Sequence, residues 1–239
     1  MHAPNPTHLH VLIPCAGNGS RAGAGTPKQY RRLAGRPLVA HTLEAFRAVT
    51  DRLATLALVV APGDAEVASA LPAFPRDANE RLLQVGGITR AASVRNGLQA
   101  LRRLGAKPSD WVLVHDAARC LLAPSQIEAL VAACEHDAVG GLLALRVADT
   151  LKAATPEGRV QSTLTRADKW LAQTPQMFRL GILQDALEKA GDAVTDEAGA
   201  IEALGLSPLL VNGSSLNIKV TYPEDFELAE AVLRARGSR

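Results

Sequence analysis

A glycine-rich segment that carries two cations follows the first apolar run of the chain. It begins Pro14-Cys-Ala-Gly-Asn-Gly-Ser-Arg21, passes two further glycines and reaches Lys28. Glycines let a backbone curl tightly and turn its N–H groups towards an anion, and the side chains of Arg21 and Lys28 add fixed positive charge. The combination predicts a loop that holds a triphosphate.

Two other phosphate-binding patterns fit this segment less well. Gly17, Gly19 and Ala22 formally match the dinucleotide fingerprint, but the loop runs on to Pro27 where that fingerprint needs a helix. The acidic residue expected at the end of the second strand is also missing. The Walker pattern, a Lys beside Ser or Thr after four spacers, is absent. A dinucleotide-dependent oxidoreductase, a nucleotide-binding module without turnover and a solvated basic loop stay as alternatives.

Further polar residues follow other apolar runs of the chain. Asp116 comes directly after the run Trp111–His115, and a carboxylate there is a natural ligand for the magnesium that accompanies nucleotide phosphates. Gly87 and Ser93 offer backbone N–H groups and a hydroxyl to a ligand. Lys219 lies near the end of the expected sheet. Taken singly, Asp116 is by default a capping residue, Gly87 and Ser93 are equally well explained as a glycine turn and a helix cap, and Lys219 is more often a surface residue than a ligand.

The sequence contains no convincing pair of nucleophile and base. Its six histidines are mostly terminal or on expected helix surfaces, and nothing resembles a Ser–His–Asp or Cys–His arrangement. Nucleotidyl transfer to a phosphate monoester needs no base, because the attacking oxygen is largely ionised near pH 7, its second pKa being about 6. Positioning and charge neutralisation are sufficient for such a reaction.

Short apolar runs that alternate with amphipathic stretches predict one α/β domain, residues 1–239, with a doubly wound, mostly parallel sheet. Ligands of such sheets bind beyond the carboxyl ends of the strands, where the segments described above lie. The expected helices include 94–101 and 127–134, together with a C-terminal helix that begins near Thr221. The expected strands are Leu9–Pro14, Leu56–Ala61, Leu82–Val85, Trp111–His115, Gly141–Leu145 and Leu209–Asn212.

A hairpin interrupts this alternation within residues 150–166. The turn signal Thr155-Pro-Glu-Gly158 stands between two short runs that favour strands. Because a two-stranded hairpin alone is marginal in water, we expect it to pack on something. A second subunit is one candidate, and the hairpin's own domain is the other.

Composition excludes several classes of protein. The 239 residues carry a formal net charge of +2 and only 3% aromatic residues, so a general nucleic-acid binder is not expected. No apolar run approaches the ~18 residues of a membrane span. The first ten residues lack the layout of a secretory signal, and three cysteines at unrelated spacings predict neither a disulfide frame nor a zinc site. A cytoplasmic protein without nucleic-acid or membrane partners is expected.

Eight sequence blocks in register resemble the 2-C-methyl-D-erythritol 4-phosphate cytidylyltransferase family, and they span most of the chain. They are Pro14–Arg21, Pro27–Tyr30, Gly86–Val94, Val114–Arg119, Asp149–Lys152, Gln173–Gln176, Thr195–Ala198 and Asn217–Thr221. The resemblance implies transfer of CMP from CTP to methylerythritol phosphate, with release of pyrophosphate, in non-mevalonate isoprenoid synthesis. It also implies Mg²⁺ or another divalent cation, and a homodimer in which each hairpin arm reaches the partner.

The resemblance assigns roles by position. Arg21, Lys28 and Lys219 would stabilise charge during in-line attack at the α-phosphorus, and Asp116 would hold the metal. The second substrate would meet Arg119, Thr195 and Lys219, with Thr150 and Arg166 supplied by the partner's arm. The nucleotide would meet Cys15, Ala16, Gly17, Gly19, Gly87, Ser93, Asp116 and Ala117.

Two departures from the family pattern affect the expected site. Ile88 stands where an acidic residue often follows the glycine pair, and Leu216 replaces the aspartate that usually precedes Asn217. The first removes a possible side-chain contact to the base or ribose, and the second removes a carboxylate near the expected metal. A relative that uses the same chemistry on a pentitol phosphate, such as ribitol 5-phosphate, remains the closest rival.

Overall fold

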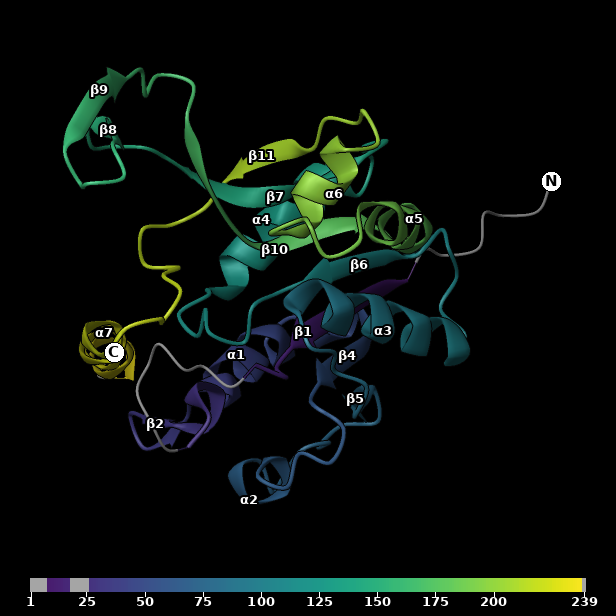
Figure 1. Ribbon diagram of the computed structural model, residues 1–239. Coiled ribbons are helices and arrows are strands. Elements are labelled where there is room, and N and C mark those ends of the chain that lie inside the picture. The colour runs from purple at the N-terminus through teal and green to yellow at the C-terminus, as the bar shows by residue number, and fades with distance from the viewer. Residues whose placement is uncertain (1–7, 18–25, 238–239) are drawn as a thin grey trace.

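The computed structural model describes residues 8–17 and 26–237, and it is built around one seven-stranded sheet (Figure 1). The strand order across the sheet is β11-β7-β10-β6-β1-β4-β5. The strands are β1 (Leu9–Pro14), β4 (Leu53–Val59), β5 (Glu80–Leu83), β6 (Trp111–Val114), β7 (Gly140–Arg146), β10 (Trp170–Arg179) and β11 (Leu209–Asn212).

The sheet is mostly parallel, as predicted. β10 alone runs antiparallel to its two neighbours, β6 and β7, whereas β1 pairs in parallel with β4 and β6. The sequence patterns did not predict β10. Its middle is Gln173-Thr-Pro-Gln176, and a proline among polar residues argues against a central strand. The pairing with β7 is irregular between Ala172 and Gln176, and this irregularity accommodates Pro175 within the sheet.

Alternating side chains on each strand build two cores, one on each face of the sheet. Val11 and Ile13 of β1 lie in one core with helices α1 and α4, and Leu12 lies in the other core with α3, α5 and α6. Both faces are therefore covered, which is the doubly wound arrangement (Figure 1). The helices of these layers are α1 (Leu38–Arg47), α3 (Arg90–Arg103), α4 (Pro124–Cys134), α5 (Leu180–Ala190) and α6 (Glu197–Glu202).

A third, smaller cluster attaches the C-terminal helix α7 (Pro223–Gly237) to the body of the protein. Phe226 and Ala229 of α7 pack against Leu33, Leu121 and Val220. The remaining short elements are η2 (Lys28–Tyr30), β2 (Arg32–Leu33), β3 (Arg36–Pro37), η3 (Thr50–Arg52) and α2 (Val67–Ala70). Within residues 8–17 and 26–237, no helix combines the length and apolar character that a bilayer crossing needs.

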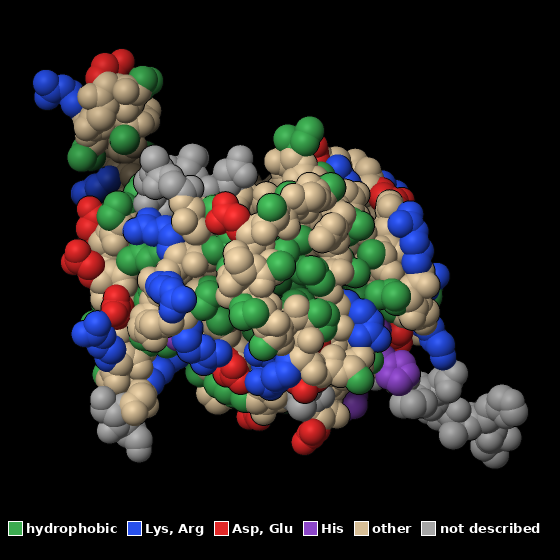
Figure 2. All heavy atoms as spheres, turned by 90° about the horizontal axis from the view of Figure 1, so that it is seen from below, with side chains coloured by type: hydrophobic (Ala, Val, Ile, Leu, Met, Phe, Trp, Pro, Cys, Tyr) green, Lys and Arg blue, Asp and Glu red, His purple; other side chains and the backbone are tan. Residues whose placement is uncertain are grey.

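The predicted hairpin is present as β8 (Leu151–Ala154) paired with β9 (Val160–Leu164). It stands clear of the body of the protein, as Figures 1 and 2 show. Every residue of β9 is exposed, and Val160 and Leu164 remain 65% and 47% exposed. The hairpin therefore does not pack on its own sheet. Its role as a dimerisation arm stays a prediction.

The order of the strands fixes where a ligand site can form. From β1 the chain builds β4 and β5 on one side, and it then crosses to β6 on the other side of β1. The carboxyl ends of β1 and β6 therefore flank a topological switch point, where open α/β sheets hold their ligands.

Candidate active site

A cleft of about 260 Å³ lies at this switch point. It collects residues from five segments that are distant in sequence. Its lining consists of Pro14–Gly17, Lys28, Gln29, Gly87–Arg90, Ser93, Asp116–Ala118 and Lys219. The structure thus brings together most of the residues that the sequence singled out for the nucleotide and the metal.

The loop after β1 is shaped by contacts with its neighbours. The N–H of Cys15 donates to the carbonyl of Val59, which continues the pairing of β1 with β4. The buried Gln29 side chain donates to the carbonyls of Cys15 and Gly17, at 3.1 and 3.0 Å. Burial also raises the pKa of the Cys15 thiol well above its ordinary value, so this cysteine is not an activated nucleophile. Gln29 thus fixes the backbone of the Cys15–Gly17 loop.

Close packing explains the glycine pair, Gly86 and Gly87, in the loop between β5 and α3. A Cβ on Gly86 would lie 2.4 Å from the Cβ of Ala16, and one on Gly87 would lie 2.5 Å from the Cβ of Ala92. The N–H of Gly87 donates to the Ser93 hydroxyl, which itself donates to the carbonyl of Thr89. This loop therefore packs directly against the Cys15–Gly17 loop across the floor of the cleft.

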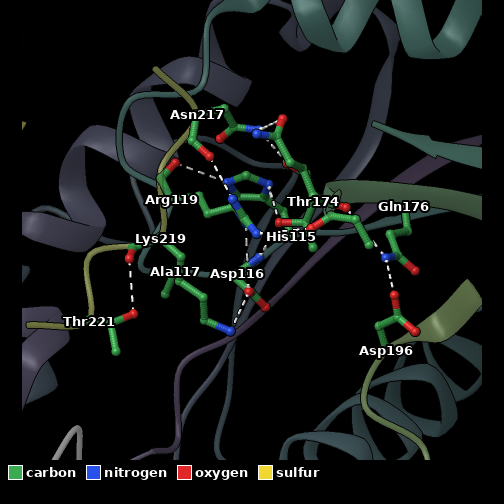
Figure 3. A network of polar contacts seen from close by, with 12 residues as sticks. His115, Asp116, Ala117, Arg119, Thr174, Gln176, Asp196, Asn217, Lys219 and Thr221 are labelled. Carbon is green, nitrogen blue, oxygen red and sulfur yellow. Dashed lines mark hydrogen bonds and ion pairs between the residues drawn. The ribbon is translucent and has the colours of Figure 1, made fainter. Parts of the chain in front are cut away.

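Asp116 is the centre of a group of charges. Its Oδ2 lies 2.8 Å from the ammonium of Lys219, and its Oδ1 lies 2.7 Å from the Nε of Arg90 (Figure 3 shows the contact with Lys219). Burial disfavours ionisation of this carboxyl, but the Arg90 and Lys219 cations outweigh burial and hold its pKa well below the ordinary value. Asp116 is therefore ionised, and it holds the side chains of Arg90 and Lys219 at the cleft.

The histidine beside Asp116 is not placed to act as a base. His115 is fully buried, its Nδ1 pairs with the Thr174 hydroxyl, and its Nε2 pairs with the carbonyl of Arg119. Burial lowers its pKa to about 4, so the ring is neutral near pH 7. Both nitrogens are engaged (Figure 3), and His115 supports the loop that carries Asp116.

The two lysines of the cleft are linked through one residue. The Lys28 ammonium donates to the carbonyl of Val220 at 2.7 Å, and the N–H of Val220 donates to the carbonyl of Ala118. Lys219 precedes Val220 in the chain, so this contact joins Lys28 to the segment that carries Lys219, and both lysines line the cleft.

Polar side chains of β10 hold the segment that leads to Lys219. The Asn217 side chain donates to the carbonyl of Thr174 at 2.9 Å and to Oε1 of Gln173 at 3.3 Å. Sequence reasoning included these residues in the family blocks but gave them no role. The buried amides of Gln173 and Gln176 could have indicated such a network, because buried polar side chains need hydrogen-bond partners. The sequence patterns did not predict β10, so these amides were not recognised as buried.

Other predicted site residues lie outside the cleft. Arg119 adjoins it, and its guanidinium donates to the carbonyl of Asn217 at 2.6 Å. Thr195 is exposed and lies just before α6. Thr150 is exposed and lies just before β8, and Arg166 is exposed and lies two residues after β9. Within one chain these last two do not reach the cleft. Gly19 and Arg21 lie outside the described residues.

The described residues do not form a metal site on their own. Asp116 is the one acid among the described residues that line the cleft, and both its oxygens are paired with cations. Within the described ranges, no three His, Cys, Asp or Glu side chains gather as metal ligands. A divalent cation would need oxygens from the bound triphosphate for most of its coordination.

Comparison with known sequences extends this interpretation. The model of the 2-C-methyl-D-erythritol 4-phosphate cytidylyltransferase family matches residues 9–235. A bifunctional IspD/IspF enzyme from Albidiferax ferrireducens is 63% identical over 95% of this chain, which spans 53% of that enzyme. A 2-C-methyl-D-erythritol 4-phosphate cytidylyltransferase from Laribacter hongkongensis is 56% identical over 93% of this chain and 95% of its own length.

Solved structures agree with the sequence comparison. A crystal structure of a 4-diphosphocytidyl-2C-methyl-D-erythritol synthase superposes with a TM-score of 0.83 at 38% identity, covering 96% of this chain and 99% of that chain. The cytidylyltransferase from Francisella tularensis gives a TM-score of 0.78 at 33% identity over 94% of this chain and 99% of its own. The chain therefore belongs to the 2-C-methyl-D-erythritol 4-phosphate cytidylyltransferase family.

Proposed function

We propose that this protein transfers the cytidylyl group of CTP to 2-C-methyl-D-erythritol 4-phosphate and releases pyrophosphate. One observation carries the proposal. Lys28, Lys219 and Asp116 share a single cleft with the backbone of two glycine-containing loops, at the carboxyl edge of the sheet. Cationic side chains and backbone N–H groups around one concave site suit a triphosphate and the charge that develops on it.

The chain's own residues account for the chemistry. The loops at Cys15–Gly17 and Gly87–Ser93 would hold the nucleoside and orient the α-phosphorus towards the second substrate. The phosphate monoester of that substrate attacks as an anion, and no general base is needed. Lys28, Lys219 and Arg21 stabilise the charge that develops during in-line attack at the α-phosphorus, and Lys219 also meets the phosphate of the second substrate. Positioning and electrostatic stabilisation thus supply the catalysis.

A divalent cation, which nucleotidyltransferases of this family typically use, belongs to this proposal as a companion of CTP. When bound, it would neutralise charge on the phosphates. Asp116 would then be its single protein ligand among the described residues, and no step above depends on it. A cytoplasmic location, in which the buried cysteines remain reduced, belongs to the same proposal.

The remainder of the proposal concerns assembly. We infer that residues 1–239 act as one domain and that the hairpin of each subunit supplies Thr150 and Arg166 to the cleft of a partner. The hairpin's exposed apolar residues and its distance from its own body support this arrangement. Arg119 and Thr195 would meet the same substrate from the home subunit.

The test is to mix the protein with CTP, magnesium and one sugar-alcohol phosphate, and to measure the release of pyrophosphate. Release is expected with 2-C-methyl-D-erythritol 4-phosphate and not with ribitol 5-phosphate. Absence of release with every sugar-alcohol phosphate would refute the transferase assignment. Release with ribitol 5-phosphate alone would favour the pentitol-phosphate rival.

A further inference from the structure

Arg90 forms a bridge between two carboxylates that lie in different parts of the chain. Its Nε donates to Oδ1 of Asp116 at 2.7 Å, and its two terminal nitrogens donate to the two oxygens of Glu197 at 2.7 and 2.9 Å. Glu197 is fully buried, and Asp116 is 6% exposed. A planar guanidinium can make these three bonds at once, whereas a lysine ammonium cannot match both carboxylates.

The Glu197 end of this bridge is fixed by its surroundings. Glu197 is the first residue of α6, and Asp196 caps that helix by accepting from the N–H of Gly199. Gln176 of β10 fastens the same turn, because its amide accepts from the N–H of Ala198 at 2.7 Å and donates to Asp196 at 2.9 Å. Figure 3 shows this contact between Gln176 and Asp196. The start of α6 is therefore attached to the sheet.

The other end of the bridge leads to Lys219. Asp116 contacts Arg90 through Oδ1 and Lys219 through Oδ2, so the position of one cation constrains the other. The Lys219 side chain is 41% exposed, and a half-exposed lysine has many rotamers unless an anion selects one. Asp116 can fix one Lys219 rotamer only while Arg90 keeps the Asp116 carboxylate in place.

We propose that Arg90 and Glu197 are positioning residues, which orient the Asp116 carboxylate and thereby aim Lys219 at the second substrate. The proposal rests on the function proposed above. It gives Asp116 a role that needs no metal. Neither Arg90 nor Glu197 was assigned a function from the sequence.

A competing role for Arg90 is direct contact with the triphosphate, since Arg90 itself lines the cleft. The two roles give different expectations for the second substrate and for kcat in Glu197→Gln, a change that keeps the guanidinium and removes the charge that anchors it. An arginine that binds triphosphate directly would be released towards CTP, and the KM for CTP would stay constant or fall. An arginine that acts through Asp116 would lose its geometry, and the enzyme would be impaired.

The experiment compares steady-state kinetics of the wild-type protein with Glu197→Gln, Arg90→Lys and the double variant. For both single variants we expect the KM for the sugar-alcohol phosphate to rise about fivefold or more and kcat to fall about tenfold. The KM for CTP should change less than twofold, because the loop that holds the nucleoside keeps its own Thr89 and Ser93 contacts. A partly unfolded sample would lower kcat without raising any KM, so the rise in KM separates positioning from stability.

The double variant and one control complete the design. If Arg90 and Glu197 act as one unit, the double variant should be no worse than the worse single variant. Glu202→Gln makes the same chemical change at an exposed position of the same helix, and it should keep wild-type kinetics. Wild-type kinetics in Arg90→Lys, or multiplied losses in the double variant, would overturn the proposal. Should Glu197→Gln fail to fold, Arg90→Lys decides alone, while the wild-type reaction separately tests the proposed function.

Discussion

The ammonium of Lys219 lies 2.8 Å from Oδ2 of Asp116, although the two residues belong to loops from different parts of the sheet. Asp116 follows β6 near the centre, and Lys219 lies beyond β11 at the edge, on a segment that returns across the carboxyl end of the strands. The backbone of Val220 pairs with Ala118 and fixes this return. The lysine is thus oriented in the folded chain itself, which lowers the cost of ordering it during the reaction.

Lys28→Ala should lower kcat by about 10²-fold or more, because it removes a cation that stabilises charge in the transition state. Its ammonium lines the cleft and donates to the carbonyl of Val220 at 2.7 Å, so the lost cation faces the place expected for the phosphates. Pyrophosphate release at saturating CTP and sugar-alcohol phosphate measures the effect. Lys189→Ala, an exposed lysine at the end of α5, is the matched control and should be unchanged. An unaltered kcat in Lys28→Ala would contradict the role assigned to it.

The sequence patterns located most strands of the sheet because their side chains are apolar on both faces. β1 and β11 have the predicted bounds, and the other predicted strands overlap the observed ones with shifted ends. β10 was missed for a physical reason. Its centre holds Thr174, Pro175 and Gln176, and the Thr174 hydroxyl and the Gln176 amide pair with the backbone of distant segments at Asp116 and Ala198.

In the site, too, residues next to a strand end could be predicted, whereas contacts between distant segments could not. Residues that follow a strand directly, such as Gly17 and Asp116, could be placed at the carboxyl edge from the pattern of strands alone. The bridge from Arg90 to Glu197 could not, because no spacing rule relates the start of α3 to the start of α6. Thr150 and Arg166 flank the hairpin strands as predicted. They do not line the cleft of their own chain, so their role in a partner's cleft stays a prediction.

Two glycines of the cleft should respond differently to alanine. No described residue lies within 4 Å of a Cβ built on Gly17, whereas one on Gly87 would lie 2.5 Å from Ala92. Gly87→Ala should therefore destabilise the fold by about 1–3 kcal/mol. Gly17→Ala should leave the stability within about 0.5 kcal/mol and raise the KM for CTP, because the new methyl enters the cleft. Urea unfolding and steady-state kinetics of both variants measure these effects. Equal losses of stability would contradict the packing argument.

Mixing two defective subunits should restore activity if the site is shared. Arg166→Ala damages the hairpin that is offered to a partner, and Arg119→Ala damages the home side of the cleft. In a heterodimer, one cleft receives both intact residues and the other receives neither, so random exchange at equal concentrations should restore about a quarter of wild-type activity. The assay is pyrophosphate release below the KM for the sugar-alcohol phosphate, after subunit exchange. Activity that stays at the average of the two separate variants would count against the shared cleft.

Acid should destabilise the protein through His115. The folded protein holds this ring neutral because burial lowers its pKa from 6.5 to about 4. In the unfolded chain the same ring takes up a proton below pH 6.5, so the unfolded state binds more protons within this window. The contribution of His115 to the free energy of unfolding is fully present above pH 6.5. It decreases as the pH drops towards 4, by up to about 3 kcal/mol. Asp116 contributes only at lower pH, because its ordinary pKa is 3.8.

His115→Gln isolates this contribution from other histidines. Burial also lowers the pKa values of His10 and His41, so the wild-type slope contains all three groups. The glutamine variant should be less stable at pH 8, since it loses the edge contact of the ring with Phe46, but its stability should fall less steeply between pH 6.5 and 4. Urea midpoints measured at half-unit pH steps give both slopes. Parallel slopes for the two proteins would mean that His115 is not the group that titrates on unfolding.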